Sequence, residues 1–505
     1  MARRRNEAIN RPKDSRAKQA LKVLVAATAV ALIAAKILGG FAADWRPSHF
    51  DEWRSIALAQ RTLESGELAR EEPVGSPNGL ARDISDRNRS LGFVAVVAAW
   101  IAAVPEPIAR FKGLALIFLL VYAAGLYALL RAIGVRAWAA LPALLALGTI
   151  PTDSMLLGPA LAVPSSLSMG ILCFALAAHV RLADSRSRKR VGWWILLMGG
   201  CGALAVIYPL ALILFGGLML TDCLARPELF RTGYAKAMGA LASLGSMLLL
   251  WAEWRGDFAA TGHHLADLFV VDQRWHLVEL VVYTLDYLVS PPVLLLALAG
   301  AVFSLSQRPR FWVAAAFLAP LLALAGYHFW GAGLVVPYQR VGLFLAFGAL
   351  LCTAVAVEEG LRAMESRRFP AGSGLITLAA LCGLILLAPR PSPPFKRTTR
   401  LERPPPALEM IAGKIAREHA PPARIYAQPR QSMFLEALTG LRAAPASLDA
   451  LLTGAPPPRL DCGAGWEIVV GPCPCPGYTM DFRVGGVPVF LHSPLGLGDP
   501  TRSTE

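Results

Sequence analysis

The adjacent carboxylates Asp51 and Glu52 are the first residues of this sequence whose type and position suggest chemistry, because they directly follow a long apolar segment. Carboxylates serve as general acids and bases, so an acidic pair at a membrane surface is a candidate reaction site. The pair also fits the first turn of a helix that Ser48 would cap, where acidic side chains interact favourably with the helix dipole. Taken alone, the pair is more simply explained as a helix start.

A second group of polar residues comprises His263 and His264, followed by Asp267 and Asp272. Imidazole and carboxylate groups at this spacing could bind a divalent metal ion, with magnesium or manganese as the candidates. The simpler interpretation is that these are polar residues of a hydrated loop.

Three of the eight cysteines, Cys462, Cys473 and Cys475, lie in the polar C-terminal part of the chain. Cys462 could form a disulfide with either of the other two if this part lies in an oxidising compartment. Three thiols without a nearby histidine are weak evidence for a metal site.

The composition indicates that these residues belong to a membrane protein. Of the 505 residues, 55% are hydrophobic and 17% are charged, which excludes an ordinary soluble enzyme. The formal net charge of +14 is spread over short basic stretches between apolar segments. Such a distribution orients helices in a membrane and does not indicate a nucleic-acid partner.

Apolar segments of spanning length recur between a basic N-terminal stretch, residues 1–20, and residue 390. We expect the first to be an uncleaved span, because its apolar part is too long for a signal peptide. The expected spans number about eleven and lie near 21–43, 113–131, 137–150, 166–182, 191–207, 209–224, 236–251, 291–306, 311–326, 341–357 and 372–389.

The charges of the connecting loops predict the orientation of these spans. Alternate loops carry clusters of arginine and lysine, as between 181 and 190, whereas the short loops 151–165 and 208–209 carry none. The positive-inside rule therefore predicts a cytoplasmic N-terminus and a long first outer loop, 44–112. The apolar stretch 91–104 is expected to be an interfacial or re-entrant helix, because counting it as a span would invert every later loop.

The segment 391–505 is expected to form a small soluble α/β domain on the outer side. It begins with proline-rich sequence and continues with an amphipathic helix around Leu408, Ile411 and Ile415. Strands are expected at 424–427 and 466–470, and a hairpin at 482–491 with its turn at the two glycines 485 and 486.

Several short motifs together resemble one family of membrane enzymes. They are Asp51-Glu52-x-Arg54, Ala59 and Leu63-Glu64-Ser65-Gly66 in the first loop, Ala109-Arg110, Leu129-Leu130-Arg131-Ala132-Ile133-Gly134, the Pro151 loop, and Pro337-Tyr338-Gln339-Arg340 before the tenth span. Over roughly the first 390 residues the sequence resembles the C-type (GT-C) glycosyltransferases that use polyprenyl-phosphate sugars. This family includes the aminoarabinose transferases of lipid A and the protein O-mannosyltransferases.

The resemblance implies a lipid-linked sugar donor and a glycan, lipid or protein acceptor at the outer, periplasmic face of a bacterial inner membrane. It also implies inversion at the sugar, with Asp51 as the general base and Glu52 assisting, binding a metal or setting the helix. The donor phosphate needs cationic partners, because a guanidinium offers a planar fork to phosphate oxygens. The candidates are Arg340 first, then Arg54, Arg82, Arg87 and Arg89.

The sequence departs from the family in the loop before the fourth span, where relatives often place a second acid just after a proline. Here Ser165 follows Pro164, and Asp153 is the only acid of that loop. This departure puts a metal-assisted mechanism in doubt.

Two alternatives belong to other functional classes. A transporter or flippase for a lipid-linked or anionic substrate is compatible with many spans, but the spans contain few ionisable residues and no inverted repeat. A non-catalytic assembly component of the cell envelope would account for the missing acid at position 165.

Overall fold

The structure is a computed structural model. It describes residues 45–47, 49–68, 91–150, 161–183, 190–231, 289–330, 338–367, 369, 372–388, 404–419, 423–427, 429–445, 467–471 and 479–492. The expected spans 21–43 and 236–251, the residues Arg82, Arg87, Arg89, Asp153, His263 and His264, and the three tail cysteines lie outside the described residues.

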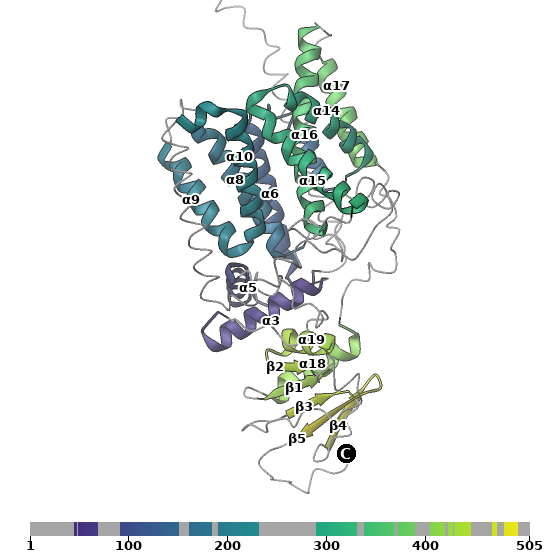
Figure 1. The fold of residues 1–505 in the computed structure, drawn as a ribbon. Coiled ribbons are helices and arrows are strands. Elements are labelled where there is room, and N and C mark those ends of the chain that lie inside the picture. The colour runs from purple at the N-terminus through teal and green to yellow at the C-terminus, as the bar shows by residue number, and fades with distance from the viewer. Residues whose placement is uncertain are drawn as a thin grey trace, which may run out of the picture.

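Apolar helices form a bundle that makes up most of the described chain (Figure 1). They are α6 (Lys112–Ala132), α7 (Leu141–Leu147), α8 (Pro164–Ala183), α9 (Arg190–Ile207), α10 (Pro209–Ala225), α14 (Pro291–Leu305), α15 (Phe311–Trp330), α16 (Tyr338–Ser366) and α17 (Ser373–Leu387), with short 3-10 turns at Pro227–Arg231 and Arg308–Arg310. Each expected span within the described residues corresponds to one of these helices. The total of eleven spans stays a prediction.

The lengths of these helices identify a membrane protein. Among the described residues, four segments are long and apolar enough to cross a bilayer, namely Lys112–Ala132, Pro164–Ala183, Arg308–Gly326 and Val341–Ser366. The helix α7 has seven residues and is shorter than the expected span 137–150. Its first turn contains Pro142, which lacks the backbone donor that a longer helix would need at this point.

Small residues let neighbouring helices of the bundle approach closely. A Cβ atom on Gly170 of α8 would lie 2.9 Å from the backbone nitrogen of Tyr122 on α6. A Cβ atom on Gly348 of α16 would overlap the backbone of Ala316 on α15. Close backbone contact at small residues is how membrane helices pack in the absence of a hydrophobic driving force between them.

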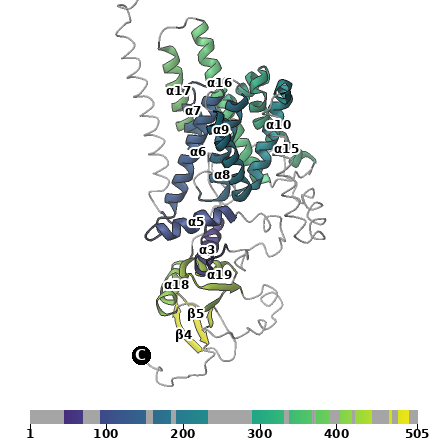
Figure 2. The ribbon, with the colours of Figure 1, turned by 90° about the vertical axis from the view of Figure 1, so that its left-hand side faces the viewer.

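Two helices of the first loop lie at one end of the bundle, between it and the C-terminal domain (Figures 1 and 2). They are α3 (Phe50–Ser65) and α5 (Leu91–Ala103). In Figure 2, α5 runs across the bundle axis, as expected for an interfacial helix. We call the end of the bundle that contacts these helices its base.

The C-terminal domain is a five-stranded sheet with two helices, which confirms the expected small α/β unit. The strand order is β2-β1-β3-β5-β4, with β1 parallel to β2 and β3, and β5 antiparallel to β3 and β4. The elements are α18 (Pro406–Glu418), β1 (Arg424–Ala427), α19 (Pro429–Thr439), β2 (Arg442–Pro445), β3 (Glu467–Val470), β4 (Thr479–Val484) and β5 (Val487–His492). The expected hairpin turn is confirmed, because Gly485 and Gly486 have φ of 57° and 83°.

One hydrophobic core joins the C-terminal domain to the base of the bundle. It contains Trp53 and Ile56 of α3, Phe93 of α5, Phe118 of α6 and Leu435 of α19, all almost fully buried. The helix α3 is therefore packed on the bundle on one side and on the C-terminal domain on the other.

Candidate active site

The helix α3 begins with a reciprocal cap that fixes the positions of both acidic residues. The cap is His49 and not Ser48: the backbone N–H of Asp51 donates to His49 Nδ1 at 3.1 Å. The backbone N–H of His49 donates in return to Glu52 Oε2 at 3.1 Å. This is the pattern of a capping box, with histidine in place of the usual serine or threonine.

Glu52 is completely buried and its carboxylate is occupied by the protein. Both oxygens lie close to the ammonium group of Lys112, with Nζ at 3.2 Å from Oε1 and 3.1 Å from Oε2. Oε1 also accepts the backbone N–H of Ala162 at 2.9 Å, just before α8 begins. The geometry therefore favours the helix-setting role for Glu52, because its oxygens join α3, α6 and the start of α8.

Asp51, the next residue along the same helix, is in a different environment. Its side chain is 29% exposed, and its Oδ2 lies 3.8 Å from His49 Nδ1. This distance is too long for a hydrogen bond, and the nitrogen accepts the backbone N–H of Asp51 instead. Among the described residues, none donates a hydrogen bond to the Asp51 carboxylate, which is therefore open to accept a proton from a ligand.

Lys112 is a site residue that the sequence analysis did not identify. It is the first residue of α6, is 5% exposed, and its backbone N–H donates to the carbonyl of Trp45. A lysine at the outer end of an expected span runs against the positive-inside rule. This exception was the available signal that Lys112 has a buried acidic partner.

Of the candidate phosphate-binding arginines, the structure describes some side chains and not others. Arg54 is half-buried on α3, three residues after Asp51. Arg340 lies in the first turn of α16, but its side chain lies outside the described part, as do Arg87 and Arg89. Towards its other end α16 carries Glu358, which bonds Arg136 beyond the end of α6, so α16 begins at the base of the bundle.

Ser165, at the position where relatives often have an acid, lies in the first turn of α8, three residues after Ala162, whose N–H bonds Glu52. Its side chain is 1% exposed, and among the described atoms its hydroxyl has no hydrogen-bond partner. The described residues also contain no group of three histidine, cysteine or acidic side chains that could hold a metal ion. Glu52 is already paired with Lys112, so its carboxylate is not available as a metal ligand.

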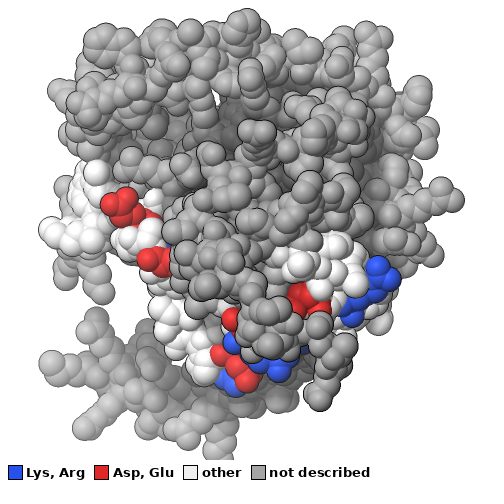
Figure 3. Space-filling model, turned by 90° about the horizontal axis from the view of Figure 1, so that it is seen from below, with Lys and Arg blue, Asp and Glu red and all other residues white. Residues whose placement is uncertain are grey.

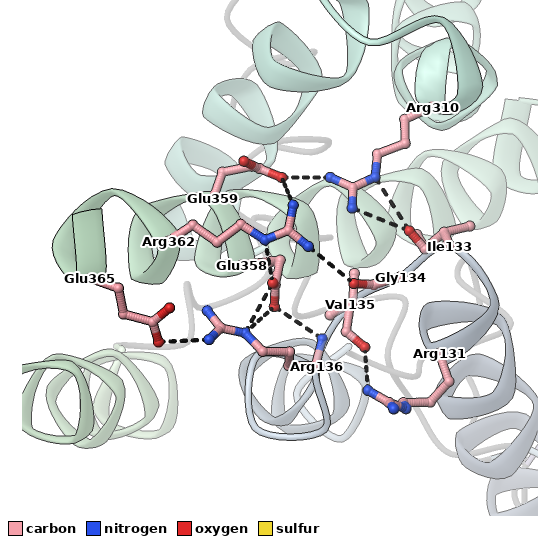
Figure 4. Close-up of polar contacts among 10 residues, drawn as sticks. All are labelled: Arg131, Ile133, Gly134, Val135, Arg136, Arg310, Glu358, Glu359, Arg362 and Glu365. Atoms are coloured by element: carbon pink, nitrogen blue, oxygen red, sulfur yellow. Dashed lines mark hydrogen bonds and ion pairs between the residues drawn. The ribbon is translucent and has the colours of Figure 1, made fainter. Parts of the chain in front are cut away.

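The opposite end of the bundle carries a network of ion pairs that the sequence analysis did not anticipate (Figure 4). Glu358 is fully buried on α16 and accepts from Arg362 Nε at 2.7 Å and from both the backbone N–H and Nε of Arg136. Arg310 donates to Glu359 at 2.6 Å. The network joins the loop after α6, the turn before α15 and the end of α16.

Arg136 illustrates the electrostatics of this network. Burial alone would lower the pKa of its guanidinium, but hydrogen bonds to the carboxylates of Glu365 and Glu358 outweigh burial and raise that pKa. The arginine therefore stays charged at any physiological pH. Asp222 is a second buried carboxylate with basic partners. His179 Nε2 lies 2.9 Å from its Oδ2, and Arg226 also bonds it. Each acid of these two groups is paired with an arginine or a histidine.

The C-terminal domain contacts α3 through side chains of α19. Arg61 forms a two-point ion pair with Glu436, and Gln60 donates to the carbonyl of Ala437 at 2.9 Å. The rings of Trp53 and Phe434 meet edge to face with centroids 5.4 Å apart. In the view from below, described basic and acidic side chains lie next to one another (Figure 3).

No protein-family model matches the sequence, and no curated protein matches it either. Solved structures do match. ArnT from Cupriavidus metallidurans bound to undecaprenyl phosphate aligns over 94% of this chain and 98% of its own, with a TM-score of 0.54 at 13% identity. ArnT and the oligosaccharyltransferase described next are both members of the GT-C superfamily.

The Archaeoglobus fulgidus oligosaccharyltransferase tethered with an acceptor peptide aligns over 84% of this chain with a TM-score of 0.52 at 13% identity. The alignment covers 63% of that longer chain. Its complex with zinc and sulfate aligns with a TM-score of 0.51 at 12% identity.

The chain has the GT-C fold. The similarity confirms the expected fold class, a helical polytopic membrane protein with a small C-terminal α/β domain. In this chain the candidate site lies in the first loop, which carries Asp51 and Glu52.

Proposed function

We propose that this GT-C chain is a glycosyltransferase that moves a sugar from a polyprenyl-phosphate donor to an acceptor hydroxyl, with Asp51 as the general base. The observation that carries the proposal is the contrast within the acidic pair. Glu52 is buried and paired with Lys112, whereas the Asp51 carboxylate is partly exposed at the start of the same helix. A base must reach the proton that it accepts, and Asp51 meets this requirement.

In the proposed reaction the acceptor oxygen attacks the anomeric carbon of the donor sugar. The bond between this carbon and the phosphate oxygen breaks, and its electron pair leaves with the lipid phosphate. Asp51 accepts the proton of the acceptor hydroxyl as the new bond forms. Attack from the side opposite the phosphate inverts the configuration at the anomeric carbon.

Two solved neighbours support a lipid-linked donor. ArnT is known with undecaprenyl phosphate, and the archaeal oligosaccharyltransferase with dolichol phosphate and a peptide. We propose Arg340 as the first phosphate ligand, with Arg54, Arg87 and Arg89 as further candidates, because arginine pairs with phosphate oxygens in a planar fork. Whether His263 and His264 bind a metal stays a hypothesis from the sequence. The sugar and the acceptor are open to direct test.

We also propose that the site faces outwards, into the periplasm of a bacterial cell, with the N-terminus in the cytoplasm. The support is the distribution of charge along the bundle. The arginines of the ion-pair network, including Arg310 and Arg362, bond carbonyls just beyond the end of α6, whereas the start of α6 is joined to α3 by Lys112. Basic residues mark the cytoplasmic end of membrane helices.

The first experiment is a transfer assay with purified protein in lipid and a panel of radiolabelled polyprenyl-phosphate sugars. Asp51→Asn keeps the size of the side chain and removes the base, so we expect turnover to fall by about 10²- to 10⁴-fold. Binding of the donor should persist in this variant. Glu67→Gln, which neutralises an exposed acid just beyond α3, is the matched control and should leave turnover unchanged.

The outcomes separate the candidate functions. Equal turnover in wild type and Asp51→Asn would reject Asp51 as the base. Absence of turnover with every donor would reject the transferase and leave a transporter or an assembly component, for which the buried serine at position 165 is the favouring observation.

A further inference from the structure

The helix that carries Asp51 is held from two sides by parts of the chain far apart in sequence. On the bundle side, Glu52 bonds Lys112 and the backbone of Ala162. On the other side, Trp53 and Arg61 contact Phe434 and Glu436 of the C-terminal domain. Figures 1 and 2 both place α3 between α5 and α19.

The ion pair of Arg61 and Glu436 has the geometry of an orienting contact. The carboxylate of Glu436 is 1% exposed and the side chain of Arg61 is 14% exposed. Arg61 uses two nitrogens, with Nη2 at 2.8 Å from Oε2 and Nε bonded to Oε1. A forked pair of this kind fixes direction as well as distance. Buried ion pairs add little net stability compared with apolar residues, so specificity of arrangement is a better account of its presence.

The contacts to the C-terminal domain lie at both ends of the segment that must be oriented. Trp53 is two residues beyond Asp51, and Arg61 is ten residues beyond it, about 15 Å along the helix axis. The polar anchor at Glu52 lies near the start of α3, and apolar residues of α3 pack in the core beside it. The ion pair at Arg61 is the polar anchor near the other end of the helix, so it ties the direction of α3 to the C-terminal domain.

We infer that the C-terminal domain is part of the transfer machinery and orients the Asp51 carboxylate through α3, with Arg61 and Glu436 as positioning residues. The inference rests on the proposed transferase function. Reacting groups have to be held within about 0.5 Å and 10–20° of the productive geometry. Neither Arg61 nor Glu436 touches the substrate in this account; both act through the direction of the helix.

The chain offers a matched control pair. Arg46 and Glu409 also join the first loop to the C-terminal domain, with Nη1 at 2.8 Å from Oε1, but their side chains are 51% and 34% exposed. Exposed pairs contribute little because water and salt screen them. Reversing the charge at Arg46 therefore tests the effect of a charge change at the same interface without loss of a buried anchor.

The test is a charge-swap cycle in the full-length protein in lipid, with Arg61→Glu, Glu436→Arg and the double variant. For each protein we would measure kcat, KM for the donor and the acceptor, binding of undecaprenyl phosphate, and hydrogen exchange of the α3 amides. We expect each single variant to lower kcat by about a hundredfold, as a misplacement of about 1 Å does. Phosphate binding should be unchanged, and amide exchange in α3 should be faster.

The double variant should restore both kcat and protection of the α3 amides, and Arg46→Glu should change neither. Glu436→Gln keeps the shape of the side chain and serves if the single reversals fail to fold; we expect it to lower kcat at unchanged phosphate binding. Wild-type kcat in a folded single variant or in Glu436→Gln would overturn the inference. A double variant that stays as slow as the single ones would also overturn it.

The outcomes distinguish this inference from the proposed function. If the wild type transfers no sugar from any donor, the transferase proposal fails. Hydrogen exchange would still show whether the pair holds α3. If the wild type is active and the cycle has no effect on kcat, only the positioning role is lost.

Discussion

At the scale of single residues, the adjacent acids of α3 differ in burial and in pairing. The cause is that segments 60 and more residues further along the chain bond Glu52 but not Asp51. Lys112 and the backbone of Ala162 bond the carboxylate of Glu52, whereas the Asp51 side chain is partly exposed. A charge buried at 0% exposure is tolerated only with a partner of opposite charge and further hydrogen bonds, and Glu52 has both.

Replacement of Lys112 by methionine should destabilise the protein strongly, because it leaves Glu52 as a buried charge without its cation. We expect the free energy of unfolding to fall by about 3–5 kcal/mol. Denaturant unfolding in detergent measures this. The double variant Lys112→Met with Glu52→Gln removes the uncompensated charge and should recover a large part of the loss.

Arg110→Met is the control for this experiment, since Arg110 is an exposed cation two residues before Lys112. It should change the free energy of unfolding by less than about 0.5 kcal/mol, as surface substitutions usually do. A Lys112→Met protein as stable as Arg110→Met would contradict the buried pair.

The sequence allowed the acidic pair to be singled out, but not the division of roles within it. A helix cap and two acids are local features and can be read from positions 48–54, although the cap is His49 rather than the serine before it. The pairing of Glu52 with Lys112 and of Arg61 with Glu436 depends on the packing of distant segments. Neither contact is associated with a periodic pattern in the sequence, so the sequence alone does not predict it.

At the scale of elements, the long apolar helices were predictable because about 20 consecutive apolar residues leave the chain few alternatives to a membrane helix. The amphipathic helix α18 and the hairpin β4–β5 were also expected and are confirmed. The helix α19 and the strand β2 were missed. The strand β2 has the sequence Arg-Ala-Ala-Pro, without the β-branched or aromatic residues typical of strands, and α19 lacks a strong apolar periodicity. Tertiary contacts therefore determine both.

Packing of α16 against α15 makes a prediction about two glycines of the same helix. A Cβ atom on Gly348 would overlap the backbone of Ala316, so Gly348→Ala should force the helices apart and destabilise the protein by about 1–3 kcal/mol. Gly360 has no other atom within 4 Å of such a Cβ. Gly360→Ala should therefore stabilise the helix by about 0.5–1 kcal/mol.

Thermal unfolding of both variants in the same detergent measures the difference. A Gly348→Ala protein with a midpoint equal to or above that of the wild type would contradict the close approach of α15 and α16. The comparison is well matched, because both glycines lie within Tyr338–Ser366 and both become alanine.

At the scale of the whole molecule, ion pairs lie at both ends of the helix bundle, but they are arranged differently at each end. At the base, isolated ion pairs connect the first loop to the bundle and to the C-terminal domain. At the other end, several arginines and glutamates form one network across α16 and its neighbours. The basic loops of that network could be anticipated from the sequence, whereas their acidic partners on α16 were not, since these lie in a helix that continues beyond its apolar part.

This asymmetry predicts the orientation of the protein in the membrane. We expect the C-terminal domain to lie outside the cell and the ion-pair network to lie in the cytoplasm. In a variant without the eight native cysteines, Asp481→Cys on the exposed strand β4 should react with a membrane-impermeant maleimide in intact cells. Arg367→Cys, exposed just beyond α16, should react only after lysis.

The reverse pattern of labelling would place α3 and Asp51 in the cytoplasm, because one hydrophobic core ties them to the C-terminal domain. Labelling of both positions in intact cells would indicate leaky cells, which a cytoplasmic marker protein detects. Protection of Asp481→Cys together with activity towards an externally added acceptor would contradict the continuous core itself. The domain that carries Glu436 and the helix that carries Asp51 have to be on the same side of the membrane for Glu436 to orient Asp51.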